Sequence, residues 1–159
     1  MRLTVPALAL AAAASVALLG ACGSKEKLSS EQADQFNARA SQFSAAMTKL
    51  NTRATACSKK AASGDVDAVA NCFARIFDDI SENFGEISNY VAGLSRDVEG
   101  ECSKRLTRVS GTLGEVSDQF STAARDFRAG DLENLQQKLG DRRLDEIGPA
   151  LNAAEKACT

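Results

Sequence analysis

The sequence predicts an all-α protein, an up-down-up-down four-helix bundle with two disulfides. From Ser29 onward, apolar residues recur at helical spacing, without the alternation of a β-strand. Short breaks that contain Gly or Ser divide this region into four segments of roughly 28–34 residues, and helices joined by such short loops run antiparallel to their neighbours. The same region holds four of the five cysteines, an even number that is typical of disulfides in an exported chain.

The first predicted helix begins at Ser29, because Gln32 follows it at the spacing of a capping box. Its apolar residues recur in alternating steps of four and three, as one face of a helix requires. They are Phe36, Ala40, Phe43, Met47, Leu50, Ala54, Cys57 and Ala61. Ser63-Gly64 is typical of a helix end followed by a new start.

The second and third helices show the same periodicity. The second carries Val66, Val69, Phe73, Ile76, Ile80, Asn83, Ile87, Tyr90 and Leu94, widened by Phe77, Phe84 and Val91. The third carries Cys102, Leu106, Val109, Leu113, Val116, Phe120, Ala123 and Phe127. We expect the turn between them at Gly93–Ser95, with Gly100 as the competing position. Gly130 ends the third helix, and Gly111 and Gly114 within it would permit the close approach of a neighbouring helix.

The fourth helix is less regular. Its apolar residues first recur at helical spacing as Leu132, Leu135 and Leu139. Gly140 interrupts the pattern, which then resumes as Leu144, Ile147, Leu151, Ala154 and Cys158. Pro149 lies inside this stretch and should kink or interrupt the helix, because proline lacks the backbone N–H that a helix interior uses.

Four cysteines allow three disulfide pairings, and the predicted topology favours one of them. Cys57 and Cys72 lie about 6 and 8 residues from the Ser63-Gly64 turn, so their heights along the bundle differ by a few ångströms. Cys102 and Cys158 lie equally far along the chain from the end of the third helix, which places them level at the opposite end. Other pairings would exceed the ~7 Å limit between bridged Cα atoms. A metal site of the four thiolates is the alternative, but the chain has no Cys-x-x-Cys pair.

The composition excludes several classes of function. The 159 residues include no His, which removes the commonest general base and metal ligand. This excludes Ser-His-Asp and Cys-His catalysis, His-containing zinc sites and His-ligated haem. With 19 basic and 21 acidic residues the net charge is -2, unlike the basic surplus of a nucleic-acid-binding protein. We therefore expect no enzyme, no cofactor and no nucleic acid; hydrolase chemistry through Asp and Glu alone is the remaining enzymatic alternative.

The N-terminal segment differs in kind from the rest of the chain. Arg2 precedes an uncharged run rich in Ala and Leu, from Leu3 to Leu19, whose flanks fit a signal peptide. The run ends in Leu19-Gly20-Ala21-Cys22. These residues resemble the lipobox of bacterial lipoproteins, in which a Leu and two small residues precede an invariant Cys. A plain secretory signal with an incidental Cys is the alternative.

The resemblance implies that residues 1–21 are a cleaved signal peptide and that Cys22 carries a diacylglycerol and usually a further acyl chain such as palmitate. Residues 22–28 would then be the lipidated Cys and a polar tether, and residues 29–159 the bundle domain. Because Gly23 rather than Asp follows the Cys, the lipoprotein sorting pattern implies the outer membrane, facing the periplasm, in a cell with two membranes. In a cell with one membrane it implies the outer face of that membrane.

Five polar residues of the second helix are candidate site residues. Asp78, Glu82 and Glu86 form an acidic stripe at intervals of one turn, which would suit a basic partner or a cation. The simpler interpretation is a solvated face that pairs with arginines of neighbouring helices, since carboxylates along one rigid line do not converge on a metal ion. Asn83 and Tyr90 lie in the apolar seam, where polar residues usually fix register but could also line a ligand cavity.

These observations favour a lipid-anchored cell-envelope protein whose helical bundle is a non-enzymatic interaction or binding module. Its partners would be the membrane, through the anchor, and a protein of the envelope that the sequence does not identify. The alternative is a carrier that holds a small apolar ligand between the helices. A cavity of about 300 Å³ or more would favour the carrier, and an exposed apolar patch would favour the protein partner.

Overall fold

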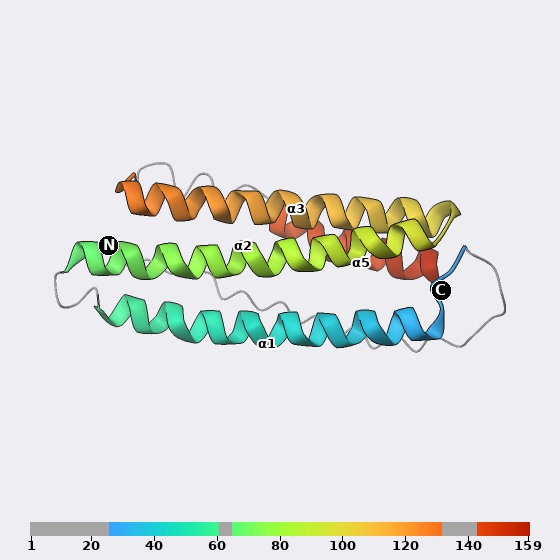
Figure 1. The fold of residues 1–159 in the computed structure, drawn as a ribbon, viewed down its shortest axis with the longest axis horizontal. Helices are drawn as coiled ribbons and strands as arrows, with labels where there is room; N and C mark the ends of the chain where they lie inside the picture. Colours follow the sequence, from blue (N-terminus) through green and yellow to red (C-terminus); the bar gives the residue numbers. More distant parts are fainter. Residues whose placement is uncertain (1–25, 61–64, 132–142) are drawn as a thin grey trace.

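The structure is a computed structural model that describes residues 26–60, 65–131 and 143–159. Within these ranges it contains four α-helices and no strand: α1 (Ser30–Lys60), α2 (Val66–Asp97), α3 (Gly100–Ala129) and α5 (Arg143–Cys158). The helices lie side by side along one long axis (Figure 1). The all-α class is therefore confirmed. The predictions for residues 1–25, 61–64 and 132–142, which include the lipobox and the first half of the fourth helix, lie outside the described residues.

The helix ends follow local sequence signals. Ser29 and Gln32 form the predicted capping box: the Gln32 N–H donates to Ser29 Oγ at 3.2 Å, and the Ser29 N–H donates to Gln32 Oε1 at 2.9 Å. At the start of α2, the Asp65 carboxylate accepts a hydrogen bond from the Ala68 N–H at 2.9 Å. Gly130 ends α3 in the left-handed conformation, with φ 73°, which glycine adopts without steric cost.

α2 and α3 form the centre of the fold. They pack against each other along most of their length, whereas α1 packs chiefly on α2 and α5 chiefly on α3 (Figure 1). The core contains buried side chains from all four helices, among them Leu50, Phe84, Val91, Val109, Val116 and Ile147. Ring contacts also connect the helices in one continuous series, in the order Phe43, Phe84, Phe120, Phe77, Phe127 and Phe73.

Serine pairs join α2 to α3 at intervals of one heptad. Ser81 faces Ser117, and Ser117 Oγ donates to the Ser81 carbonyl at 2.7 Å. Near the middle, Ser88 Oγ donates to the Ser110 carbonyl at 2.9 Å, and Ser110 Oγ donates in return to the Ser88 carbonyl at 3.0 Å. The third pair lies beside the turn.

In this third pair, Ser103 Oγ donates to the Ser95 carbonyl at 2.6 Å. We name the three pairs the serine ladder. Side chains that bond to the backbone of the opposite helix require the two helix axes to lie close together. The descending order of the partners along α3 also shows that α2 and α3 are antiparallel.

Two glycines make room for the serine ladder. A Cβ at Gly85 would lie 3.3 Å from Ser117 Oγ, and a Cβ at Gly114 would lie 3.4 Å from Ser88 Oγ. Gly111 is exposed, and a Cβ there would meet nothing within 4 Å. The prediction of a close helix approach therefore holds for Gly114 and is wrong for Gly111.

The predicted position of one turn is also wrong, and so is the interruption, though not the kink, that was predicted as one of two effects of Pro149. The turn between α2 and α3 lies at Val98–Glu99, followed by Gly100 with φ 67°, and not at Gly93–Ser95. Ser95 is buried in the serine ladder instead of capping a helix. Pro149 does not interrupt α5, which continues through it to Cys158. Pro149 is exposed, so the backbone carbonyl that lost its donor can bond to water instead.

Both cysteine pairs lie at disulfide distance, in the pairing expected from the sequence. Cys57 on α1 is bonded to Cys72 on α2, with 5.8 Å between their Cα atoms. Cys102 on α3 is bonded to Cys158 on α5, with 4.7 Å between their Cα atoms. The two disulfides therefore attach α1 and α5 to the central α2–α3 pair.

Candidate ligand-binding groove

An apolar groove lies between α1 and α5, with α2 and α3 at its base, and its volume is about 220 Å³. It arises because α1 and α5 rest on different central helices and make at most sparse contact with each other. The α1 side is lined by Ala33, Phe36, Ala40, Phe43 and Met47, the α5 side by Ile147, Leu151 and Ala154, and the base by Phe84, Ile87, Val91, Leu106, Val109 and Leu113.

The groove follows α1 for most of that helix. Its lining on α1 extends from Ala33 to Asn51, which corresponds to about 27 Å of helix at 1.5 Å per residue. At one end it reaches Leu28 and Thr159. Lys27 Nζ donates a hydrogen bond to the Thr159 carbonyl, so this contact joins the residues before α1 to the end of α5.

The sequence of α1 explains why the groove is open. Of the predicted apolar seam, Leu50 and Cys57 are buried, but Phe36, Phe43 and Met47 are only half-buried. These half-buried side chains are the ones that line the groove. Among the described residues no helix covers this part of the seam, and an uncovered apolar surface of this kind is typical of a binding site.

Polar residues border the apolar lining. On α1 they are Asn37, Ser44, Thr48 and Asn51, and on α5 they are Asn152, Glu155 and Thr159. Glu155 is the one charged side chain among the described residues of the lining. A mostly apolar pocket with a few polar groups at its border is typical of sites for small ligands.

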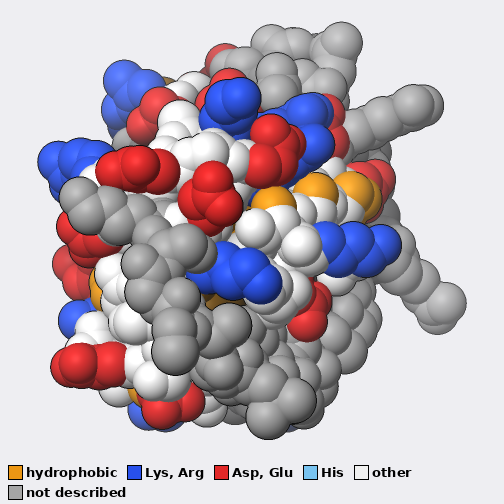
Figure 2. Space-filling view, turned by 90° about the vertical axis from the view of Figure 1, so that its right-hand side faces the viewer, with side chains coloured by type: hydrophobic (Ala, Val, Ile, Leu, Met, Phe, Trp, Pro, Cys, Tyr) orange, Lys and Arg blue, Asp and Glu red, His pale blue; other side chains and the backbone are white. Residues whose placement is uncertain are grey.

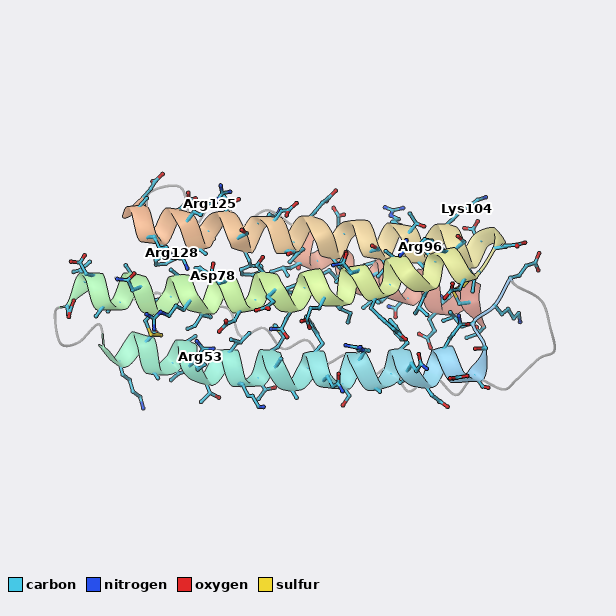
Figure 3. The ribbon with its side chains drawn as sticks, viewed as in Figure 1. Arg53, Asp78, Arg96, Lys104, Arg125 and Arg128 are labelled. Carbon is cyan, nitrogen blue, oxygen red and sulfur yellow. A yellow bond between two sulfur atoms is a disulfide. The ribbon has the colours of Figure 1, made fainter. Side chains whose placement is uncertain are left out.

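The acidic stripe lies on a different part of α2 and does not line the groove. Asp78 pairs with Arg128 of α3, and neighbouring Asp79 pairs with Arg53 of α1 (Figure 3). Glu82 and Glu86 are exposed. The structure thus places the Asp78 end of the stripe in an inter-helix ion pair, and such half-exposed pairs contribute little to stability.

Asn83 and Tyr90 also lie outside the groove lining, although their neighbours Phe84 and Ile87 belong to it. Asn83 Nδ2 donates to the Asp79 carbonyl one turn earlier, at 2.6 Å. The Arg39 guanidinium of α1 lies 5.5 Å from the centre of the Tyr90 ring. Burial raises the pKa of Tyr90 above its ordinary value of 10.0, and the positive charge of Arg39 opposes that rise. Tyr90 therefore contributes to the α1–α2 contact.

Val66, with an exposed fraction of 70%, is the one large hydrophobic residue in the described ranges that is mostly exposed. At the end of the bundle where α2 and α3 join, acidic and basic side chains are interspersed, and a short row of hydrophobic side chains is visible among the described residues (Figure 2).

The described residues contain no group of three or more His, Cys, Asp or Glu side chains that could hold a metal ion. None of the helices in the described ranges is both long and apolar enough to span a membrane. The chain matches no model of a known protein family, no curated protein and no solved structure.

Sequence reasoning did not find the groove, although α1 carried a signal for it. Asn37, Ser44 and Asn51 repeat at heptad spacing directly beside the apolar seam. In a fully packed bundle that flank would face another helix, and apolar or small residues would be expected there. Three polar residues in that position indicate that α2 covers one side of the α1 seam and that α5 leaves the other side open.

Proposed function

We propose that this chain is a lipid-anchored protein of the bacterial cell envelope and that its helical bundle is a non-enzymatic binding module. The anchor is proposed from the lipobox resemblance at Leu19-Gly20-Ala21-Cys22. Localisation follows from the anchor. In a cell with two membranes the protein would lie on the outer membrane, facing the periplasm, and in a cell with one membrane it would lie on the outer face of that membrane. The up-down-up-down order of the helices belongs to this proposal, and the antiparallel serine ladder and the two disulfides support it.

The groove between α1 and α5 is the observation that carries the binding function. Its apolar lining, with a few polar groups at the border, favours the small apolar ligand. The volume of about 220 Å³ falls short of the roughly 300 Å³ expected of a carrier's cavity, so the ligand proposed here is more slender than a drug-sized molecule.

The anchor can be tested by replacing Cys22. In the wild-type protein, mass spectrometry of the N-terminal peptide should show that the chain begins at an acylated Cys22, and the protein should fractionate with membranes. In Cys22→Ser, neither the acyl group nor the membrane association should remain. Ser24→Ala, two residues further on, is the matched control and should behave as wild type. If Cys22→Ser is processed and held in the membrane like wild type, the anchor proposal is wrong.

A further inference from the structure

We propose that the groove binds one acyl chain of a membrane lipid, with the lipid headgroup outside the groove at its Leu28–Thr159 end. This inference deepens the binding function proposed above and rests on it. Three properties of the groove support it: its proportions, the chemistry of its lining and its place relative to Cys22.

The proportions of the groove fit a chain of methylene groups. About 220 Å³ is distributed along about 27 Å of α1, so the mean free cross-section is small. An α-helix with its side chains is about 10–12 Å wide and would not fit without displacing α1. An acyl chain in a bilayer spans about half of the hydrocarbon thickness of about 30 Å, which is well below the length of the groove.

The lining suits an acyl chain in its chemistry. Phe36, Phe43, Met47 and Phe84 offer aromatic and thioether surface to a flexible apolar chain, and Met adapts its shape to such ligands. Each methylene group that leaves water for this lining adds to the stability of the bound state. Glu155 is the one charge among the described residues of the lining, which leaves no cation there to hold an anionic headgroup inside the groove. The headgroup is therefore expected to remain in solvent or at the membrane surface.

The chain itself brings one end of the groove near the membrane. Leu28 lines that end, and only six residues separate it from Cys22. Even fully extended, six residues reach about 20 Å. An anchor at Cys22 would therefore keep the Leu28–Thr159 end close to the lipid headgroups. Cys57–Cys72 fixes α1 at its far end, so a small outward movement of the near end of α1 would admit the lipid.

The test uses residues 22–159 with Cys22→Ser and intact disulfides, because the described core is formed entirely by residues from Leu28 to Cys158. The probe is cis-parinaric acid, a linear fatty acid whose fluorescence rises when it leaves water. We expect saturable binding of one molecule per chain. Ala40→Phe fills the groove from its α1 side and should weaken binding at least tenfold. Ala45→Phe, on the same helix but exposed outside the lining, is the matched control and should bind as wild type.

Ser44→Phe is a second groove-filling variant that keeps the test valid if Ala40→Phe does not fold. Ser44 lines the groove but is exposed, so a larger side chain there should not disturb the core. It should also weaken binding while the helical circular dichroism stays unchanged. In a second experiment, wild type, Ala40→Phe and Ala45→Phe are each incubated with phosphatidylethanolamine vesicles and re-isolated. Wild type and Ala45→Phe should then contain lipid, and Ala40→Phe should not. Equal binding of the probe by all variants would overturn the proposal. So would a dimer of the wild-type chain that Ala40→Phe dissociates, since a second copy would then be the occupant. Neither result depends on acylation of Cys22, which is measured separately.

Discussion

The α2–α3 interface and the α1–α5 groove both carry polar residues at heptad spacing, yet one is closed and the other is open. In the serine ladder, each serine of α2 meets a serine of α3 at the matching height, and the α3 serine donates to the backbone carbonyl of its α2 partner; Ser88 also donates in return to Ser110. Asn37, Ser44 and Asn51 of α1 repeat in the same way, and Asn152, Glu155 and Thr159 of α5 also line the groove, but among the described residues no side-chain hydrogen bond joins these two polar sets across it. A polar heptad thus closes an interface only where the opposite helix carries its complement.

The same two regions differ in what holds them together. The α2–α3 pair is held by close packing and by hydrogen bonds, each worth about 0.5–1.5 kcal/mol. α1 and α5 have smaller contacts with this pair, and each is attached to it by a disulfide. The two walls of the groove are therefore joined to a rigid centre at defined points, and the length of wall between those points can adjust to a ligand.

The largest expected effect comes from removing the attachment of α5. Replacing Cys102 and Cys158 together with Ala should lower the free energy of unfolding by about 4 kcal/mol, because the unfolded chain regains the freedom of a long loop. The Cys57–Cys72 disulfide closes a shorter loop, so the Cys57→Ala and Cys72→Ala double variant should lower the free energy of unfolding by about 3 kcal/mol. Urea denaturation measures both. A loss below about 1 kcal/mol for the Cys102–Cys158 pair would show that packing alone holds α5.

Serine to leucine substitutions compare the two regions directly. Ser88→Leu introduces a large side chain between α2 and α3 and removes the bonds to Ser110, so it should cost about 3 kcal/mol or more. Ser44→Leu places the same side chain at the border of the groove, where the change should lie within about 0.5 kcal/mol. Thermal unfolding of both variants, followed by circular dichroism, gives the difference. Similar losses at the two positions would contradict the contrast between a closed and an open interface.

Glycine to alanine substitutions test the same contrast with a smaller effect. Gly111→Ala, in open space on α3, should stabilise the protein by about 0.5–1 kcal/mol, because alanine favours the helix. Gly85→Ala gains the same helical preference, but its Cβ would press on Ser117 Oγ in the serine ladder, so the gain should be cancelled. Denaturation midpoints of the two variants measure the difference. Equal stabilisation would contradict close packing of α2 against α3 at Gly85.

Local signals predicted much of this structure from the sequence. The Ser29 and Gln32 capping box, the glycine at the end of α3 and the cysteine pairing all depend on short-range rules or on distances along straight helices. The turn before α3 lies elsewhere because Ser95, a good helix cap, continues α2 instead: its hydroxyl donates to the Ala92 carbonyl, and its own carbonyl accepts a hydrogen bond from Ser103 Oγ. Its role depends on Ser103 of the opposite helix, and local preference does not encode that partner.

The groove could not be predicted in the same way. Helical periodicity shows that Phe36, Phe43 and Met47 share one face, but not how completely that face is covered. Coverage depends on α1 and α5 resting on different central helices, which is a property of the assembled bundle. Asn83 and Tyr90 drew attention as polar residues in an apolar seam, whereas the groove is lined by the apolar residues beside them.

Hydrogen exchange of the backbone amides tests most directly the claim that a rigid α2–α3 centre carries an adjustable groove. In the free protein, amides around Ser88 and Ser110 should exchange most slowly, and those of α1 from Phe36 to Met47 should exchange faster. Saturating fatty acid should slow exchange in that part of α1 and in α5 and leave the α2–α3 interface unchanged. Equal protection of all helices in the free protein, or a fatty-acid effect confined to α2 and α3, would contradict the account.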